Sequence, residues 1–215
     1  MRTYVCTLGY HSTRVTRPVL DNGIDSGDRI VVLRPTEDDD EDGRAAQAVD
    51  DIREMASTID PESRVETAQL RTASFTETVR DCLSLLADAD GDAIAVFGGG
   101  PREVFLPFTV AVCTRRDLVT EALQFRDMDG VVSEVPVPDL LARAPSRTDP
   151  TLALIDDLGG ETTLPELSAA SDHSKSTVGR HLDELEAAGL VSTESETQTR
   201  LIDLTLTGEL HLSRG

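Results

Sequence analysis

The fold of the C-terminal third is decided by residues 174–191, which read SKSTVGRHLDELEAAGLV. A helix over residues 175–188 is predicted, because apolar residues recur there at helical spacing: Val178, Leu182 and Leu185. Ser174 can cap the start of this helix, and Gly189 suits the left-handed position that ends it. Leu190 then begins a run typical of a strand, so the stretch predicts a helix followed directly by a β-ribbon.

The residues on either side of this stretch complete a small domain. Two further helices are expected before it, over residues 151–158 and 163–170, the second opened by the capping box of Thr163 and Glu166. After it, runs at 190–193 and 200–206 alternate apolar and polar residues around a polar tip. Helix, helix, tight turn, helix and ribbon is the order of a winged helix-turn-helix, which we expect over residues 150–215.

The third helix of this domain has the charge pattern of a DNA-reading element. It carries no acid before Asp183, so its N-terminal half, the part that enters the major groove in this motif, is neutral to basic. Residues 174–191 strongly resemble the recognition helix and wing entry of archaeal and bacterial transcription regulators. The residues expected to contact DNA are Ser174, Lys175, Ser176, Thr177, Arg180 and His181, with Arg200 in the wing. The alternative is a protein-binding winged helix, which the four basic and 13 acidic residues of positions 148–215 favour.

The N-terminal part alternates predicted strands and helices. Apolar strand runs and amphipathic helices follow one another as β-α-β-α-β-α-β-α, and a hairpin with its turn at residues 127–130 comes last. This pattern predicts an α/β fold, a Rossmann-like doubly wound sheet with an added β-hairpin. The helix that follows Pro101 is apolar nearly all round, so we expect it to be buried on several sides, at a subunit interface for example. We assign residues 1–142 to this domain and the polar, proline-flanked residues 143–149 to a linker.

Two glycine turns of the N-terminal domain are the candidate ligand site. In a sheet of order 3-2-1-4, strands 1 and 4 are neighbours, and ligands bind beyond their carboxyl ends. The first turn opens a helix after strand 1, and the second opens a helix after strand 4, so both offer backbone N–H groups to an anion. The simpler alternative is that the glycines merely form turns. The candidate ligand-binding residues are Gly9, Tyr10, His11, Ser12, Thr13 and Arg14, with Gly98, Gly99, Gly100, Pro101, Arg102 and Glu103.

Known nucleotide fingerprints do not fit these turns. The dinucleotide pattern is missing, because Gly9 is not followed by Gly-x-x-Gly, and Arg34-Pro35 stands where an acid would hold a ribose. The P-loop pattern is missing as well. We therefore expect a phosphate-bearing ligand other than NAD, with Tyr10 able to stack on a base.

The two turns and the domain order together resemble the CRISPR-associated CARF–winged-helix transcriptional regulators. The resemblance implies a homodimer whose paired CARF domains form one two-fold ligand site. It further implies binding of a cyclic oligoadenylate, chiefly the four-membered ring, and altered binding to double-stranded promoter DNA of CRISPR loci. Family motifs often have Phe where Tyr10 stands, and an aliphatic residue where Pro101 precedes Arg102.

Catalysis is an open alternative at the same turns. Some CARF domains cleave their ligand, and residues 11–13 could act on a phosphodiester, so a ring nuclease is the second hypothesis. A regulator that senses another nucleotide is the third. No catalytic residue is assigned, and no cofactor or metal is expected, since His173 and His181 have no cysteine between them and the acidic run 37–42 is most simply a loop.

The amino-acid composition indicates the environment in which the protein works. The 215 residues include 40 acidic and 20 basic residues, a net charge of −20, with Lys175 as the only lysine. This resembles proteins of salt-in halophiles, in which molar salt reduces the Debye length to ~3 Å, so net charge does not exclude a DNA partner. No membrane span or secretory signal is evident, which predicts a cytoplasmic protein. The three widely spaced cysteines are expected to be buried, reduced thiols.

Overall fold

The computed structural model describes residues 1–36, 42–196 and 199–213. The chain divides into two compact units, Met1–Val137 and Pro138–Gly215. The acidic run predicted as a loop lies outside the described residues, apart from Asp42. Each unit is described separately below.

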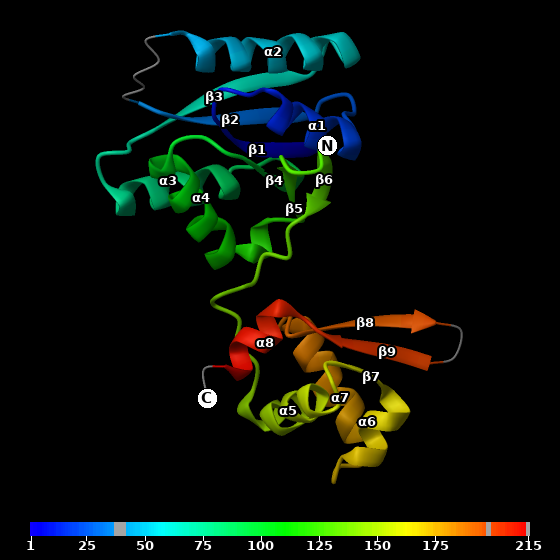
Figure 1. Cartoon of the computed structure of the whole chain (residues 1–215). Helices are drawn as coiled ribbons and strands as arrows, with labels where there is room; N and C mark the ends of the chain where they lie inside the picture. Colours follow the sequence, from blue (N-terminus) through cyan, green and yellow to red (C-terminus); the bar gives the residue numbers. More distant parts are fainter. Residues whose placement is uncertain (37–41, 197–198, 214–215) are drawn as a thin grey trace. The chain divides into compact units, whose positions relative to one another are not determined.

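The first unit is a six-stranded sheet of order β3-β2-β1-β4-β5-β6, in which only β6 is antiparallel to its neighbour (Figure 1). This confirms the predicted doubly wound sheet with an added hairpin. The strands are β1 (Arg2–Leu8), β2 (Arg29–Pro35), β3 (Arg64–Leu70), β4 (Asp92–Gly98), β5 (Glu121–Arg126) and β6 (Val131–Glu134). The helices are α1 (Thr13–Asn22), α2 (Arg44–Ile59), α3 (Phe75–Ala87) and α4 (Arg102–Thr114), followed by the 3-10 turn η1 (Arg116–Leu118).

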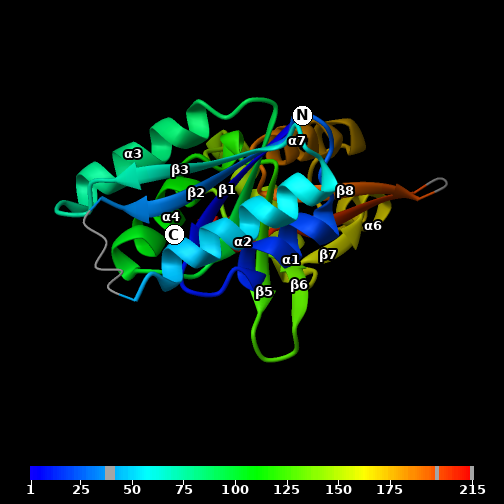
Figure 2. The same ribbon diagram turned by 90° about the horizontal axis from the view of Figure 1, so that it is seen from above.

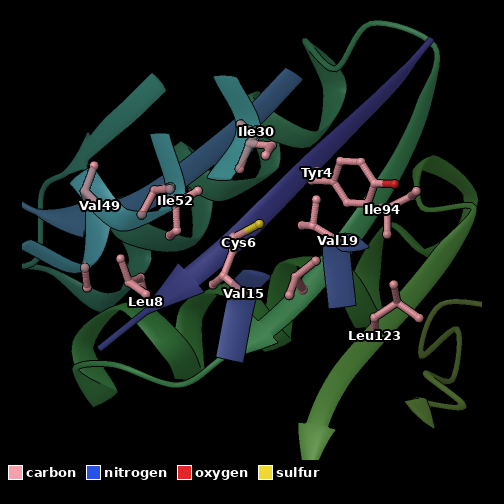
Figure 3. Close-up of a cluster of buried hydrophobic side chains, with 14 residues drawn as sticks. Tyr4, Cys6, Leu8, Val15, Val19, Ile30, Val49, Ile52, Ile94 and Leu123 are labelled. Atoms are coloured by element: carbon pink, nitrogen blue, oxygen red, sulfur yellow. The ribbon is translucent and has the colours of Figure 1, made fainter. Parts of the chain in front are cut away.

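Two apolar layers cover the sheet because its central strands are apolar on both faces. On one face, alternate residues of β1 such as Tyr4, Cys6 and Leu8 pack against α1 and α2 (Figure 3). On the other face, Val5 and its neighbours on β2 and β4 pack against α3 and α4. The sheet is therefore clamped between helices, with the carboxyl ends of β1 and β4 left in register at Leu8 and Gly98.

The second unit is a three-helix core with a β-ribbon, the winged helix expected from the sequence (Figure 1). Its recognition helix ends as predicted, at Gly189 with φ +69°, and the Leu190 N–H donates to the Leu185 carbonyl at 2.9 Å. The strands form a sheet of order β7-β9-β8. The elements are η2 (Ser146–Thr148), α5 (Asp149–Asp157), β7 (Glu161–Thr163), α6 (Leu164–Ala170), α7 (Lys175–Ala187), β8 (Val191–Glu196), β9 (Thr199–Leu204) and α8 (Leu206–Leu212).

The structure differs from the expected domain limits and ribbon ends. The units divide after Val137 rather than after residue 142, and the expected linker 143–149 contains η2 and the start of α5. Ala142 already packs in the core of the second unit, which explains the earlier boundary. The expected second ribbon strand, 200–206, ends at Leu204, and α8 begins at Leu206.

The cysteines carry no disulfide. Cys6 and Cys82 are buried as expected, whereas Cys113 on α4 is only partly buried. Burial raises the pKa of the Cys82 thiol to about 12 and that of Cys6 further, so both thiols stay protonated at neutral pH. Among the helices of the described segments, none combines the length and apolar character needed to cross a bilayer.

Candidate functional site

The two glycine turns that follow β1 and β4 are in direct contact. A Cβ built on Gly9 would lie 3.3 Å from the Cα and N atoms of Gly100. A Cβ on Gly100, whose φ is +105°, would lie 2.3 Å from the carbonyl oxygen of Leu8. Only glycine fits such an approach, so the turns meet because both lack side chains. The expectation that residues ninety positions apart share one edge of the sheet is confirmed.

A cavity of about 490 Å³ opens at this contact, within the size range of small-molecule sites. It lies at the carboxyl ends of β1 and β2, between the starts of α1, α2 and α4. The backbone of the two turns forms part of its wall, and two guanidinium groups contribute positive charge. Its lining residues are Leu8, Gly9, Tyr10, His11, Arg14, Arg34, Ala45, Gly100 and Pro101.

Backbone donors point from two helix starts toward this edge. In α4 the first backbone hydrogen bond is donated by Val104, to the Pro101 carbonyl at 3.0 Å. The N–H groups of Arg102 and Glu103 come before it, in the first turn, where an α-helix leaves its donors without intrahelical partners. In α1 the Arg14 N–H donates to the His11 carbonyl at 3.3 Å and the Val15 N–H to the Ser12 carbonyl at 2.9 Å, and the N–H groups of Ser12 and Thr13 come before them. Two helix N-termini beside one cavity favour an anionic ligand.

Arg34 and Arg14 supply the charge of the lining. Arg34 is the last residue but one of β2, is only 6% exposed, and lines the cavity. Arg14 donates from Nε and Nη2 to the carboxylate of Asp127 at 2.9 and 2.7 Å. The Arg14 charge is therefore shared with the β5–β6 turn in the structure.

Tyr10 and His11 are exposed groups at the mouth of the cavity. The Tyr10 ring is 54% exposed, and the Arg44 guanidinium carbon lies 4.8 Å from the ring centroid. The ring therefore presents a cation–π surface against which a base could stack. Within the described residues, no carboxylate forms a hydrogen bond or an ion pair with His11, and the neighbouring Ser12 hydroxyl donates to Asp51 Oδ2 at 2.9 Å.

The recognition helix α7 forms the second candidate surface. The Ser174 side chain accepts the Thr177 N–H at 3.3 Å and contacts the hydroxyls of Ser176 and Thr177 at 3.0 Å. This cap fixes the helix start, and Lys175 and Arg180 are both exposed. The apolar face of the helix, with Val178, Leu182 and Leu185, is fully buried against α5 and α6.

Comparison with known families then accounts for both units. The family model described as the Csa3 CRISPR-associated Rossmann-like domain matches residues 2–128, more than half of the chain. The chain belongs to this family. A MarR family model matches residues 150–201, from α5 into β9. No curated protein matches the chain.

Membership in the Csa3 family supports the predicted class of protein. A CRISPR-associated Rossmann-like domain followed by a MarR-type winged helix is the domain composition of a CARF–winged-helix regulator. The resemblance inferred from the glycine turns and the recognition helix is confirmed at this level.

The structure divides the expected ligand residues of this family member into two groups. Gly9, Tyr10, His11, Arg14, Gly100 and Pro101 line the cavity. The others lie in the same two segments, in the turns or in the adjoining ends of β4, α1 and α4, outside its lining: Ser12, Thr13, Gly98, Gly99, Arg102 and Glu103. Gly98 has a packing role, since a Cβ there would lie 2.2 Å from the Thr7 carbonyl oxygen. Arg34 also lines the cavity and was not among the predicted ligand residues. Its place at the end of an apolar strand run next to strand 1 is the sequence signal that indicates the lining.

Two of the expected DNA contacts are placed differently by the structure. His181 is 3% exposed, and its Nδ1 lies 2.8 Å from the Thr151 hydroxyl of α5, so this ring belongs to the core rather than to the outer face. The guanidinium of Arg200 is held by Asp183 at 2.8 Å and by Glu186 at 2.7 Å. Arg200 therefore ties the wing to α7 instead of pointing freely toward a groove.

Proposed function

We propose that the protein is a dimeric regulator that binds a cyclic oligoadenylate, of four units in the leading case, between paired Rossmann-like domains and controls promoter DNA of CRISPR loci. The observation that carries the proposal is the contact of the two glycine turns beside the cavity of about 490 Å³. The turns bring two helix N-termini and the guanidinium groups of Arg14 and Arg34 to one place. Such a place favours a phosphate-bearing ligand over a neutral one.

The form of the ligand follows from symmetry. A ring of four adenylates has a two-fold axis, and an isologous dimer presents every group of its interface twice. One cavity would then receive half of the ring, with a base on the exposed Tyr10 ring and phosphates at the helix starts. A mononucleotide has no two-fold axis and could not contact both protomers in the same way.

Helix α4 offers a surface for such a dimer, because it begins at the second glycine turn. Leu106 is 52% exposed and Val110 is 37% exposed, and with the partly buried Cys113 they follow one another at helical spacing along a single stripe. Association through this stripe would remove apolar surface from water and place two cavities on either side of a two-fold axis. The expectation that this helix lies at an interface stays a prediction.

The output of the regulator is assigned to α7. Its exposed N-terminal half carries Lys175, Arg180 and a cluster of hydroxyls, the side chains that contact phosphates and base edges in winged helices. A ligand that prefers one arrangement of the dimer changes DNA affinity by changing the spacing of the two recognition helices, which must match ~34 Å of duplex.

One experiment tests the proposal and separates it from ring cleavage. Cyclic tetra-adenylate is mixed with the protein in molar KCl, binding is measured by calorimetry, and the ligand is recovered by chromatography. Tight binding with an intact ring supports a sensor, whereas a linear product supports the ring nuclease. Absence of binding to this ring, together with binding of a mononucleotide, would overturn the proposal in favour of a sensor of another nucleotide.

A further inference from the structure

The ion pair between Arg14 and Asp127 joins the cavity to a turn that is 113 positions away in sequence. Arg14 is on the first turn of α1 and lines the cavity, whereas Asp127 opens the turn between β5 and β6. Both oxygens of the carboxylate are engaged, by Nε at 2.9 Å and by Nη2 at 2.7 Å. This parallel two-bond geometry is the one with which arginine binds a carboxylate or a phosphate.

The guanidinium of Arg14 is also fitted against the second glycine turn. A Cβ built on Gly99, whose φ is +86°, would lie 3.0 Å from Arg14 Nη1. The group is thus placed between the glycine backbone on one side and Asp127 on the other. Its side chain is 34% exposed, and that of Asp127 is 60% exposed, so solvent and small anions can reach the pair.

We propose that Asp127 is an internal anion that occupies Arg14 in the free protein, so that a ligand must displace this carboxylate to use the guanidinium. The inference rests on the proposed function, since it concerns the same cavity. Asp127 thereby acts as a specificity-determining residue. A ligand with several phosphates can replace the carboxylate and gain further contacts at the helix starts. A ligand with a single carboxylate would only replace one arginine–carboxylate pair with another, so it would gain no binding free energy from the exchange.

Displacement has a consequence for the β5–β6 turn. Helix α1 packs beside β5 and β6, and the turn extends past the neighbouring strands (Figure 2). Asp127 links the turn to α1 by an ion pair, whereas Asp129 in the same turn pairs with Arg126 of the hairpin itself. Displacement would therefore remove this ion pair at the turn, while the packing of α1 against β5 and β6 and the ion pair within the hairpin remain. Strand β6 then leads directly to Val137, where the first unit ends.

The test compares two substitutions in this one turn. Asp127→Asn removes the carboxylate that holds Arg14, and Asp129→Asn removes an equal charge that does not touch Arg14. Affinity for cyclic tetra-adenylate is measured by calorimetry in molar KCl, where charges beyond direct contact are screened. We expect Asp127→Asn to bind about two- to fivefold more tightly than the wild type, the range that an exposed ion pair contributes, and Asp129→Asn to bind unchanged. In an Arg14→Ala background the gain from Asp127→Asn should disappear.

Each outcome decides between the two claims. Equal affinities of the two variants, with the wild type still binding the ring, would overturn the role of Asp127 and leave the proposed function intact. If the wild type does not bind the ring, the proposed function fails, and the same comparison with inorganic tripolyphosphate still decides the role of Asp127.

Hydrogen exchange supplies an independent readout of the turn. Ligand should accelerate exchange at the amides of residues 127–130 in the wild type, because the turn loses its link to α1. The same amides should not respond in Asp127→Asn, whose turn is already released. Protection of the turn by ligand in the wild type would contradict the displacement.

Discussion

Replacing Gly100 with alanine tests whether the two glycine turns touch. The new Cβ would lie 2.3 Å from the Leu8 carbonyl oxygen and 2.8 Å from its carbon, both backbone atoms that no side-chain rotation can move. Gly27→Ala is the matched control, because Gly27 lies in the same unit at φ +87° and its nearest neighbour is Met1 Sδ at 4.0 Å. The two variants share the cost of a positive φ and differ in the clash.

The expected magnitudes follow from these two distances. A left-handed alanine costs about 1–2 kcal/mol, offset by about 0.4–1 kcal/mol from the stiffer unfolded chain, so Gly27→Ala should lower the free energy of unfolding by about 1 kcal/mol. Gly100→Ala must also separate the turns, and overpacking of a tight contact adds about 1–3 kcal/mol. We therefore expect Gly100→Ala to lose about 2–4 kcal/mol.

Calorimetric melting of the full chain in molar KCl measures both losses, and a binding titration with cyclic tetra-adenylate measures the site. Gly100→Ala should melt well below Gly27→Ala and should lose ligand affinity, whereas Gly27→Ala should bind as the wild type does. If the two variants melt together and bind equally, the turns are not in contact and the cavity between them is wrongly placed.

Four further predictions concern the recognition helix and the dimer. Arg180→Ala should weaken binding to promoter DNA at least tenfold in gel-shift titrations while Arg17→Ala, an equal charge change on α1, leaves it unaltered. Gly179→Ala should raise the free energy of unfolding by about 1 kcal/mol in calorimetric melting, because nothing lies within 4 Å of its Cβ and alanine favours a helix, and a drop would contradict this. Burial lowers the pKa of His181 below its ordinary 6.5, so the unfolded chain binds more protons and stability should fall as the pH drops below about 6.5; melting curves of His181→Asn should lack this dependence. Leu106→Glu should shift the mass measured by light scattering from dimer to monomer, and an unchanged mass would move the interface away from α4.

The sheet order could be predicted from the sequence because its central strands are short apolar runs separated by helices with clear starts. Such runs have few alternatives to buried parallel strands, and the right-handed crossover then limits their order. Thr163 marks a helix start, and the capping box expected with Glu166 is present in the structure. The strand order predicts that the turns after β1 and β4 are neighbours, and the glycines at both turns allow the close contact of Gly9 with Gly100.

Elements that depend on a distant partner were not predicted. Strand β7 has three residues and exists because Thr162 pairs with Ile202 of β9, a contact without a local pattern. The start of α8 has a local sequence signal, the capping residue Thr205, but the alternating apolar residues of β9 continue past it. Leu206 continues the spacing of Ile202 and Leu204, yet Thr205 caps a helix by accepting the Gly208 N–H at 3.1 Å.

The sequence predicts where the backbone of each site lies, but it predicts much less about the contacts of the side chains there. The turns follow from glycine positions, but the partner of Arg14 is a carboxylate from a different hairpin, and no spacing rule connects the two. The burial of His181 was accessible in principle. It lies three residues after Val178 and four before Leu185, on the apolar face of the helix.

The excess of acidic residues in the winged helix is a weaker argument against DNA binding when its ion pairs are taken into account. The acids on the C-terminal half of α7 would repel DNA, but Asp183 and Glu186 are both held by Arg200, and Glu184 accepts from Arg147 at 2.7 Å. The guanidinium groups of Arg147 and Arg200 offset two of these three negative charges. At molar salt the Debye length is ~3 Å, so the binding of DNA to the cations of the helix start would depend little on the net charge of the domain. In the proposed regulator, Arg200 would favour DNA binding by offsetting part of the charge of Asp183 and Glu186 and by holding the wing against α7.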